Sequence, residues 1–139
     1  MTRMSWDRDL DLGIPVVDRD HRRLIDLIAR VQSPDWGADA LELVRATVDD
    51  LAHHVAHHFR HEEMLMRLVG YPDMARHQRS HRAIAARLAE FQSLLRRGRA
   101  MFPHDRFRIF LSEPMLSHLL DVDMELKPWV DRLADRIAA

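Results

Sequence analysis

Residues 57–81 read HHFRHEEMLMRLVGYPDMARHQRSH, and this stretch decides the fold. Within it His58 precedes Glu62 by four residues, and His77 precedes His81 by four. An α-helix advances about 100° per residue, so side chains four residues apart share one face. Between the two pairs, a Gly-Tyr-Pro segment ends one helix and lets the chain reverse. Two neighbouring helices would therefore direct three imidazoles and a carboxylate toward one point.

Composition limits the class of protein. The chain has 139 residues without internal repeats, which is most simply one domain over residues 1–139. Lys and Arg total 21 against 22 for Asp and Glu, so the net charge of −1 gives no electrostatic reason to expect a nucleic-acid or anionic membrane partner. No segment has the roughly 18 apolar residues of a membrane span, and acidic residues stand where a secretory signal would be apolar. We therefore expect a cytoplasmic protein.

Residue usage also narrows the chemistry. The absence of cysteine excludes disulfides, thiolate nucleophiles, iron–sulfur clusters and cysteine-ligated zinc. The four glycines are too scattered to build a phosphate-binding loop. Histidine, in contrast, occurs ten times. The distribution of these histidines over the helix faces is therefore the main functional signal.

Apolar periodicity and helix-end signals divide the chain into an arm and five helices. We expect an extended arm over residues 1–17, whose apolar residues cover one end of the core, and long helices at about 18–32, 35–69, 73–97 and 105–127. A short terminal helix should follow at about 128–137. The expected N-caps are Asp18, Asp73 and Asp105, and the expected helix ends are Gly70 and Gly98. Pro114 should bend the fourth helix and Pro128 should separate the terminal one.

Each of the four long helices carries histidine on its apolar stripe. These inward positions are His21, His58, His77 with His81, and His118, in chain order. Four amphipathic helices with short or moderate connections predict an all-α fold, an antiparallel up-down-up-down four-helix bundle. In this topology the inward histidines can lie at one level of the bundle.

Five inward imidazoles with carboxylates exceed the four ligands of a single zinc ion. They suit two first-row ions bridged by carboxylate, with iron, manganese or zinc favoured over magnesium or calcium. An unpaired polar group in an apolar bundle costs on the order of 1–3 kcal/mol, and an ionised carboxylate costs more. A domain with ~5–15 kcal/mol of net stability would not absorb seven such groups unless something binds them.

A histidine considered alone, and the histidines outside the inward set, have simpler interpretations than a metal site. A single histidine on an apolar stripe, such as His21 taken alone, is more often a hydrogen-bonded core residue than a ligand. We expect four of the remaining histidines to lie in solvent, namely His53, His57, His61 and His104. His54 lies near the edge of the stripe and could support the ligands from behind.

The second bridging carboxylate is open on spacing alone. Asp121 and Asp123 follow His118 by three and five residues. On an ideal helix both lie about 100° from the centre of the apolar stripe, so the geometry does not choose between them. A local π-bulge would let the pair spaced by five share a face, and such bulges are frequent at functional sites.

The sequence resembles the hemerythrin family, specifically the single-domain bacterial hemerythrins, over nearly its whole length. The matching motifs are Gly13-Ile14, Val17-Asp18-x-x-His21-x-x-Leu24, His58-Phe59-x-x-Glu62-Glu63-x-x-Met66, Gly70-Tyr71-Pro72, His77-x-x-x-His81 and His118-x-x-x-x-Asp123. It departs from the family pattern at Asp20, at Pro114-Met115 and in a longer connection from His81 to His118.

This resemblance implies a centre of two non-haem iron ions with an oxo or hydroxo bridge. It favours Asp123 over Asp121 as the carboxylate that bridges the irons together with Glu62. It further implies that one iron is held by His77, His81 and His118. The other would be held by His21 and His58, and would keep an open position.

The function implied by the resemblance is reversible binding of O2 at that open iron position, for storage, delivery or sensing, with no particular protein recipient indicated. Apolar walls of the O2 pocket, chosen for helical adjacency to the ligands, are Ile25, Val55, Phe59, Leu116 and Leu119. We therefore expect a binding protein rather than an enzyme. The alternatives are a di-iron oxidase or peroxidase-like enzyme, a redox or iron sensor acting through a partner, and a structural zinc bundle. Oxidases of the ferritin type use Glu-x-x-His pairs, and no Glu in this chain has His three residues later.

Overall fold

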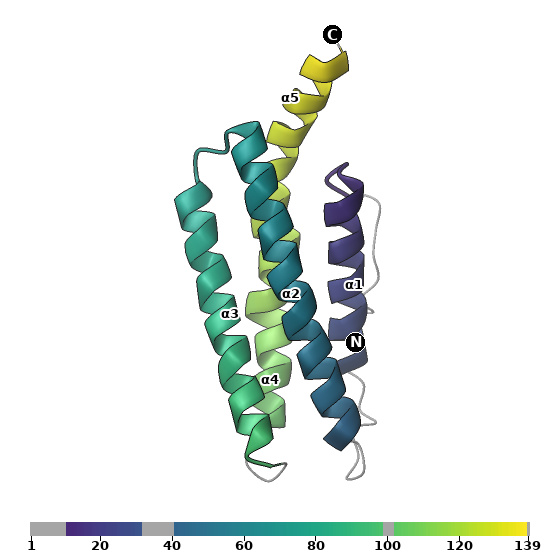
Figure 1. Cartoon of the computed structure of the whole chain (residues 1–139), viewed down its shortest axis with the longest axis vertical. Coiled ribbons are helices and arrows are strands. Elements are labelled where there is room, and N and C mark those ends of the chain that lie inside the picture. The colour runs from purple at the N-terminus through teal and green to yellow at the C-terminus, as the bar shows by residue number, and fades with distance from the viewer. Residues whose placement is uncertain (1–10, 32–40, 99–101, 139) are drawn as a thin grey trace.

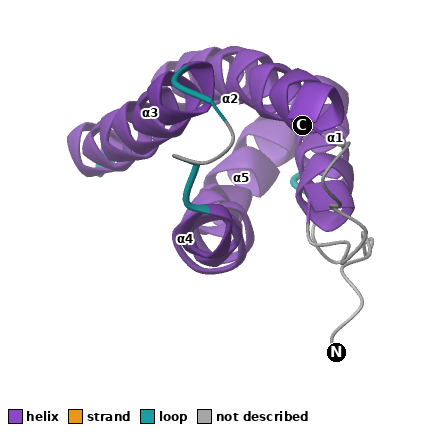
Figure 2. Cartoon of the chain, turned by 90° about the horizontal axis from the view of Figure 1, so that it is seen from below, coloured by secondary structure: helices purple, strands orange, loops and turns teal. Residues whose placement is uncertain are grey.

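The computed structural model describes residues 11–31, 41–98 and 102–138. These residues are almost entirely helical, and no strand occurs among them. Seen along the bundle, α1, α2 and α3 form an arc and α4 lies on its open side (Figure 2). Successive long helices run in opposite directions (Figure 1). The expected all-α antiparallel bundle is confirmed.

The first helix begins earlier than expected. Helix α1 spans Pro15–Val31, with proline at its first position, where a missing N–H costs nothing. Asp18, the expected N-cap, instead lies in the first turn. Its carboxylate accepts hydrogen bonds from the backbone N–H groups of Leu12 at 2.6 Å and Gly13 at 3.1 Å. The prediction of Asp18 as cap was wrong because its side chain binds the arm segment rather than the helix.

Helices α2 and α3 carry four of the seven inward polar residues. Helix α2 spans Leu41–Val69 and α3 spans Met74–Arg96, and α2 packs against both α1 and α3. Gly70 and Gly98 end these helices with φ of 68° and 110°, a conformation that favours glycine. Asp73 stands at the N-cap of α3 but its side chain makes no cap hydrogen bond, and it pairs instead with Arg76 at 3.6 Å. Expected residues 1–10 of the arm and 35–40 of the second helix lie outside the described residues.

The fourth helix is not a uniform α-helix. Helix α4, His104–Phe110, continues into a π-helix at Leu111–Met115, a second π-helix at His118–Val122 and a 3₁₀ turn at Asp123–Leu126. Pro103, not Asp105, occupies the N-cap of α4, because the helix begins one residue earlier than expected. Pro114 lies inside the first π-helix, at the expected irregularity. Helix α5, Lys127–Ala138, then leaves the bundle at an angle (Figure 1).

Two apolar clusters fill the bundle on either side of a polar layer. The larger cluster includes Ile28, Leu51, Leu88 and Phe107, and draws on α1 to α4. The smaller one covers the opposite end and includes Leu12 of the arm with Met66, Tyr71 and Leu126. On each long helix the inward histidines stand between the members of these two clusters. The part of the arm that is described therefore covers one end of the core, as expected.

Among the described residues, none of the helices has both the length and the apolar character needed to cross a lipid bilayer.

The contacts of Asp18 give a stability prediction. Asp18→Ala should lower the free energy of unfolding by about 1–3 kcal/mol, because two buried or half-buried backbone N–H groups lose a charged acceptor. Urea denaturation measures this difference. Asp26→Ala, an exposed site on the same helix, is the matched control. Equal stabilities of the two variants would contradict the role assigned to Asp18.

Candidate metal centre

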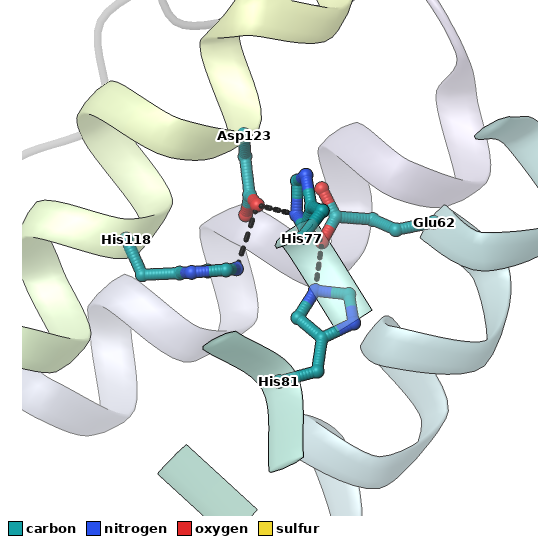
Figure 3. A group of neighbouring side chains, drawn as sticks. All are labelled: Glu62, His77, His81, His118 and Asp123. Atoms are coloured by element: carbon teal, nitrogen blue, oxygen red, sulfur yellow. Dashed lines mark hydrogen bonds and ion pairs between the residues drawn. The ribbon is translucent and has the colours of Figure 1, made fainter. Parts of the chain in front are cut away.

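Seven polar side chains meet between the two apolar clusters. Each exposes no more than 3% of its surface. They are His21 of α1, His58 and Glu62 of α2, His77 and His81 of α3, His118 at the start of the second π-helix, and Asp123 just after it. These are the seven residues expected from the sequence, and the structure brings them all together. Figure 3 shows Glu62, His77, His81, His118 and Asp123 pointing toward one another.

The second π-helix places Asp123 in the centre. A π-helix has a wider turn than an α-helix, so residues five apart lie nearly above one another. His118 and Asp123 are so spaced, and His118 Nε2 lies 2.9 Å from Asp123 Oδ1. This is the local widening that sequence spacing left open. The side chain of Asp121 lies outside the described residues.

The carboxylate of Asp123 is divided between two groups of imidazoles. Its Oδ1 lies 2.9 Å from Nε2 of both His77 and His118. Its Oδ2 lies 3.0 Å from Nε2 of both His21 and His58. The two oxygens of this carboxylate thus face two different groups of imidazoles, as the oxygens of a bridging ligand do.

Glu62 lies across from Asp123 and also faces both groups. Its Oε1 lies 3.1 Å from Nε2 of His81 and 3.1 Å from Nε2 of His58. Its Oε2 is 3.8 Å from Nε2 of His21. All five imidazoles therefore present Nε2 to the two carboxylates.

This donor set fits two metal ions. Two groups have ligand atoms that all lie within 4.8 Å of one another: Glu62, His77, His81, His118 and Asp123, and His21, His58, Glu62 and Asp123. Ligand atoms at about 2.1 Å from one ion and at right angles are about 3 Å apart, the spacing seen here. Hydrogen bonds leave part of the set unsatisfied, because Glu62 Oε2 is buried without a hydrogen-bond partner among the described residues. A positive ion between the groups would satisfy this atom.

Electrostatics of the metal-free cluster point the same way. Burial alone lowers the pKa of His58, but the Glu62 charge and a hydrogen bond to Asp123 outweigh it and raise that pKa well above its usual range. Burial alone raises the pKa of Glu62, yet His58 and His21 hold it well below its usual range. The pKa of Asp123 is lowered by His118, His21 and His58 against burial and the Glu62 charge. Protons therefore occupy imidazoles where metal ions would otherwise bind.

The family model described as the hemerythrin HHE cation binding domain matches residues 12–130. The chain belongs to the hemerythrin family. A bacteriohemerythrin of Stenotrophomonas maltophilia (strain R551-3) is 30% identical over 119 residues, which cover 86% of this chain and 76% of that protein. A bacteriohemerythrin of Methylococcus capsulatus (strain ATCC 33009 / NCIMB 11132 / Bath) is 25% identical over 124 residues, covering 88% of this chain and 93% of that protein. The crystal structure of wild-type hemerythrin matches the fold with a TM-score of 0.78, over 93% of this chain and 98% of that chain at 22% identity.

Hemerythrin-family membership and the buried cluster together support the expected function, that of a di-iron oxygen-binding protein. The cluster itself shows a site able to bind metal ions.

Three further residues support the hemerythrin-family cluster from behind and were not expected from the sequence. Ser80 Oγ lies 2.8 Å from Nδ1 of His118, and Glu63 Oε2 lies 3.3 Å from Nδ1 of His81. Asp20 Oδ2 lies 3.8 Å from Nδ1 of His58. Partners of this kind fix which ring nitrogen faces a metal ion. Each of these three residues is next to an inward residue in the sequence, which is the signal that could have found it.

Three of the histidines expected in solvent, His57, His61 and His104, are half-buried instead. Nδ1 of His61 lies 2.5 Å from Oδ2 of Asp20, so this residue belongs to the support of the centre. His104 is half-buried and its ring packs 4.9 Å from that of Phe102. These predictions failed because periodicity places a residue relative to its own helix and not relative to the side chains around it. His54 is half-buried, with its ring 5.6 Å from that of His53.

The residues expected to wall an O2 pocket lie in the larger apolar cluster. Ile25, Val55, Phe59 and Leu119 are buried there, and Leu116 is partly buried against them. Phe59 stacks on His81 with ring centroids 3.8 Å apart, and so lies beside the three-imidazole group. Their role as pocket walls stays a prediction.

The pKa of His77 predicts how metal-free protein responds to pH. Burial alone lowers this pKa, but Asp123 and Glu62 raise it from the ordinary 6.5 to about 9. A raised folded-state pKa contributes stability that is complete below pH 6.5 and lost as the pH rises through 9. In chelator, the urea unfolding midpoint should therefore fall over this interval. His77→Gln should flatten the fall, and an unchanged pH dependence in that variant would contradict the assignment.

Proposed function

We propose that this chain holds two iron ions and binds O2 reversibly, as an oxygen-storage, delivery or sensing protein. His77, His81 and His118 would hold one ion, and His21 and His58 the other. Glu62 and Asp123 would bridge them. The observation that carries the proposal is the division of Asp123, whose two oxygens face imidazoles of the two groups at 2.9–3.0 Å.

The two groups are unequal, and this inequality supports binding of a small ligand on one side. One group offers three imidazoles and the other two, while both share the carboxylates. When bound, the two irons supply the electrons and the open coordination position at which O2 is held and released. The chain's own contribution is to hold five imidazoles with Nε2 inward and to keep the position surrounded by buried side chains.

Water exclusion is the second contribution of the chain. Ile25 follows His21 by one helical turn and Val55 precedes His58 by one, so each shares a face with an imidazole of the smaller group. Both side chains are at least nine-tenths buried. A dry, low-dielectric surrounding limits proton access to a bound ligand and so slows irreversible oxidation of the centre.

The donor composition supports a binding protein over a di-iron oxidase. Ferritin-like oxidases build their sites from Glu-x-x-His pairs on facing helices. The cluster of this chain has five imidazoles and two carboxylates, with no such pair. We further propose that the chain acts without a nucleic-acid or membrane partner, on the grounds of the net charge of −1.

A cycle of reduction and exposure to air tests the function. Protein reduced under argon should be nearly colourless, gain visible absorption when air is admitted, and lose it again under argon over repeated cycles. Elemental analysis should find about two irons per chain, one for each group of ligands. Immediate irreversible oxidation would favour the enzyme or sensor alternative, and protein that holds zinc alone would overturn the proposal.

Variants of α2 test the ligand assignment. His58→Ala and Glu62→Ala should each lower the iron content and the thermal midpoint together, because binding of metal ions to this cluster contributes folding free energy. His54→Ala, one helical turn before His58 and outside the cluster, is the matched control and should retain both. Full iron content in Glu62→Ala would contradict its role as a bridge.

A further inference from the structure

Three histidines of α2 that are not among the seven central residues form a row along the helix. His53, His57 and His61 follow one another at intervals of four residues, so they share one helix face. His53 is exposed and His57 is half-buried. The face of α2 that carries them is separate from the inward face that carries His58 and Glu62.

His53 and His57 have the geometry of the buried pair on α3. Their ring centroids are 4.4 Å apart with an interplanar angle of 71°. The corresponding values for His77 and His81 are 4.6 Å and 72°. The two pairs therefore share the same ring separation and interplanar angle, one inside the bundle and one on the surface of α2.

The third histidine of the row is differently placed. His61 is 6.3 Å from His57 between centroids, with an interplanar angle of 40°, and its Nδ1 faces Asp20. It therefore serves the support of the centre and not the surface pair. The chelating pair is His53 with His57.

The hydrogen bond between Arg60 and His57 engages one of the two ring nitrogens of His57. Arg60 donates it to Nδ1 at 3.0 Å, so this contact does not involve Nε2. The guanidinium of Arg60 opposes a bound cation, but Arg60 is exposed and can turn into solvent. Exposed Asp50, three residues before His53, adds a negative charge close to the pair.

We propose that His53 and His57 form an exposed binding site for one first-row divalent cation, separate from the buried centre. Neutral imidazole is a good ligand for Zn²⁺, Cu²⁺ and Ni²⁺. Two imidazoles four residues apart on a helix would hold such an ion as a chelate, with water completing the coordination. The site does not depend on which metal occupies the buried centre.

Calorimetric titration with Ni²⁺ tests the site. Protein that carries its buried metal should take up about one further Ni²⁺ per chain, with the content of the buried metal unchanged by elemental analysis. His53→Gln and His57→Gln should each weaken this binding about tenfold or more, which corresponds to about 1.4 kcal/mol. Circular dichroism checks that both variants keep the helical content of the parent.

Neighbouring histidines provide the controls. His54→Gln, adjacent to His53 on a different face, should bind Ni²⁺ as the parent does. The proposal is overturned if the parent takes up no additional Ni²⁺, or if His53→Gln binds like the parent. It is also overturned if His54→Gln weakens binding as much as the pair variants, because the uptake would then be a general property of the histidine-rich segment.

Discussion

The fold is arranged around a carboxylate with no exposed surface, that of Asp123, set among four imidazoles. A buried carboxylate without positive partners would cost several kcal/mol. Imidazoles can stabilise this carboxylate only if helices that are far apart in the sequence place their Nε2 atoms at the same height along the bundle. Asp123 itself cannot reach that level from a regular helix carrying His118. The second π-helix supplies the missing rotation, so the irregularity of the fourth helix follows directly from the electrostatic demand of the centre.

The position of the centre along the bundle explains how the polar layer is tolerated. Apolar clusters lie on both sides of it, one built from all four long helices and the other completed by the arm and α5. Water is thereby kept from the two carboxylates, which strengthens every interaction inside the layer. In metal-free protein the layer replaces apolar packing with paired charges, which stabilise a core less than apolar packing does. Binding of ions there and folding are consequently linked.

Periodicity in the sequence predicted the bundle and six of the seven central residues, because inward positions recur regularly along each helix. Periodicity did not decide between Asp121 and Asp123, because an ideal helix places both at a similar angle from the apolar stripe. Only the π-helix brings Asp123 into line with His118. Family resemblance supplied that choice. The N-cap positions assigned to Asp18 and Asp105 were wrong, since both lie in the first turn of their helices. Asp73 does occupy the N-cap of α3, but its side chain pairs with Arg76 and does not bind the backbone of the helix. Asp20 and Ser80 were missed because they lie off the apolar stripe and act across helices.

The residues behind the imidazoles make the two halves of the centre different. His81 and His118, in the three-imidazole group, are held at Nδ1 by Glu63 and Ser80 within 3.3 Å. In the other group, His58 is 3.8 Å from Asp20, whose carboxylate oxygen is engaged more closely by His61. A partner at Nδ1 fixes the ring and raises the basicity of a ligand. The ring of His58 is therefore less constrained at Nδ1 than the rings of His81 and His118, and its neighbour Asp20 is held by a histidine that reaches the surface. An ion held by His21 and His58 would also have fewer imidazole ligands than one held by the other group, which is consistent with the proposed exchange of a small ligand on that side.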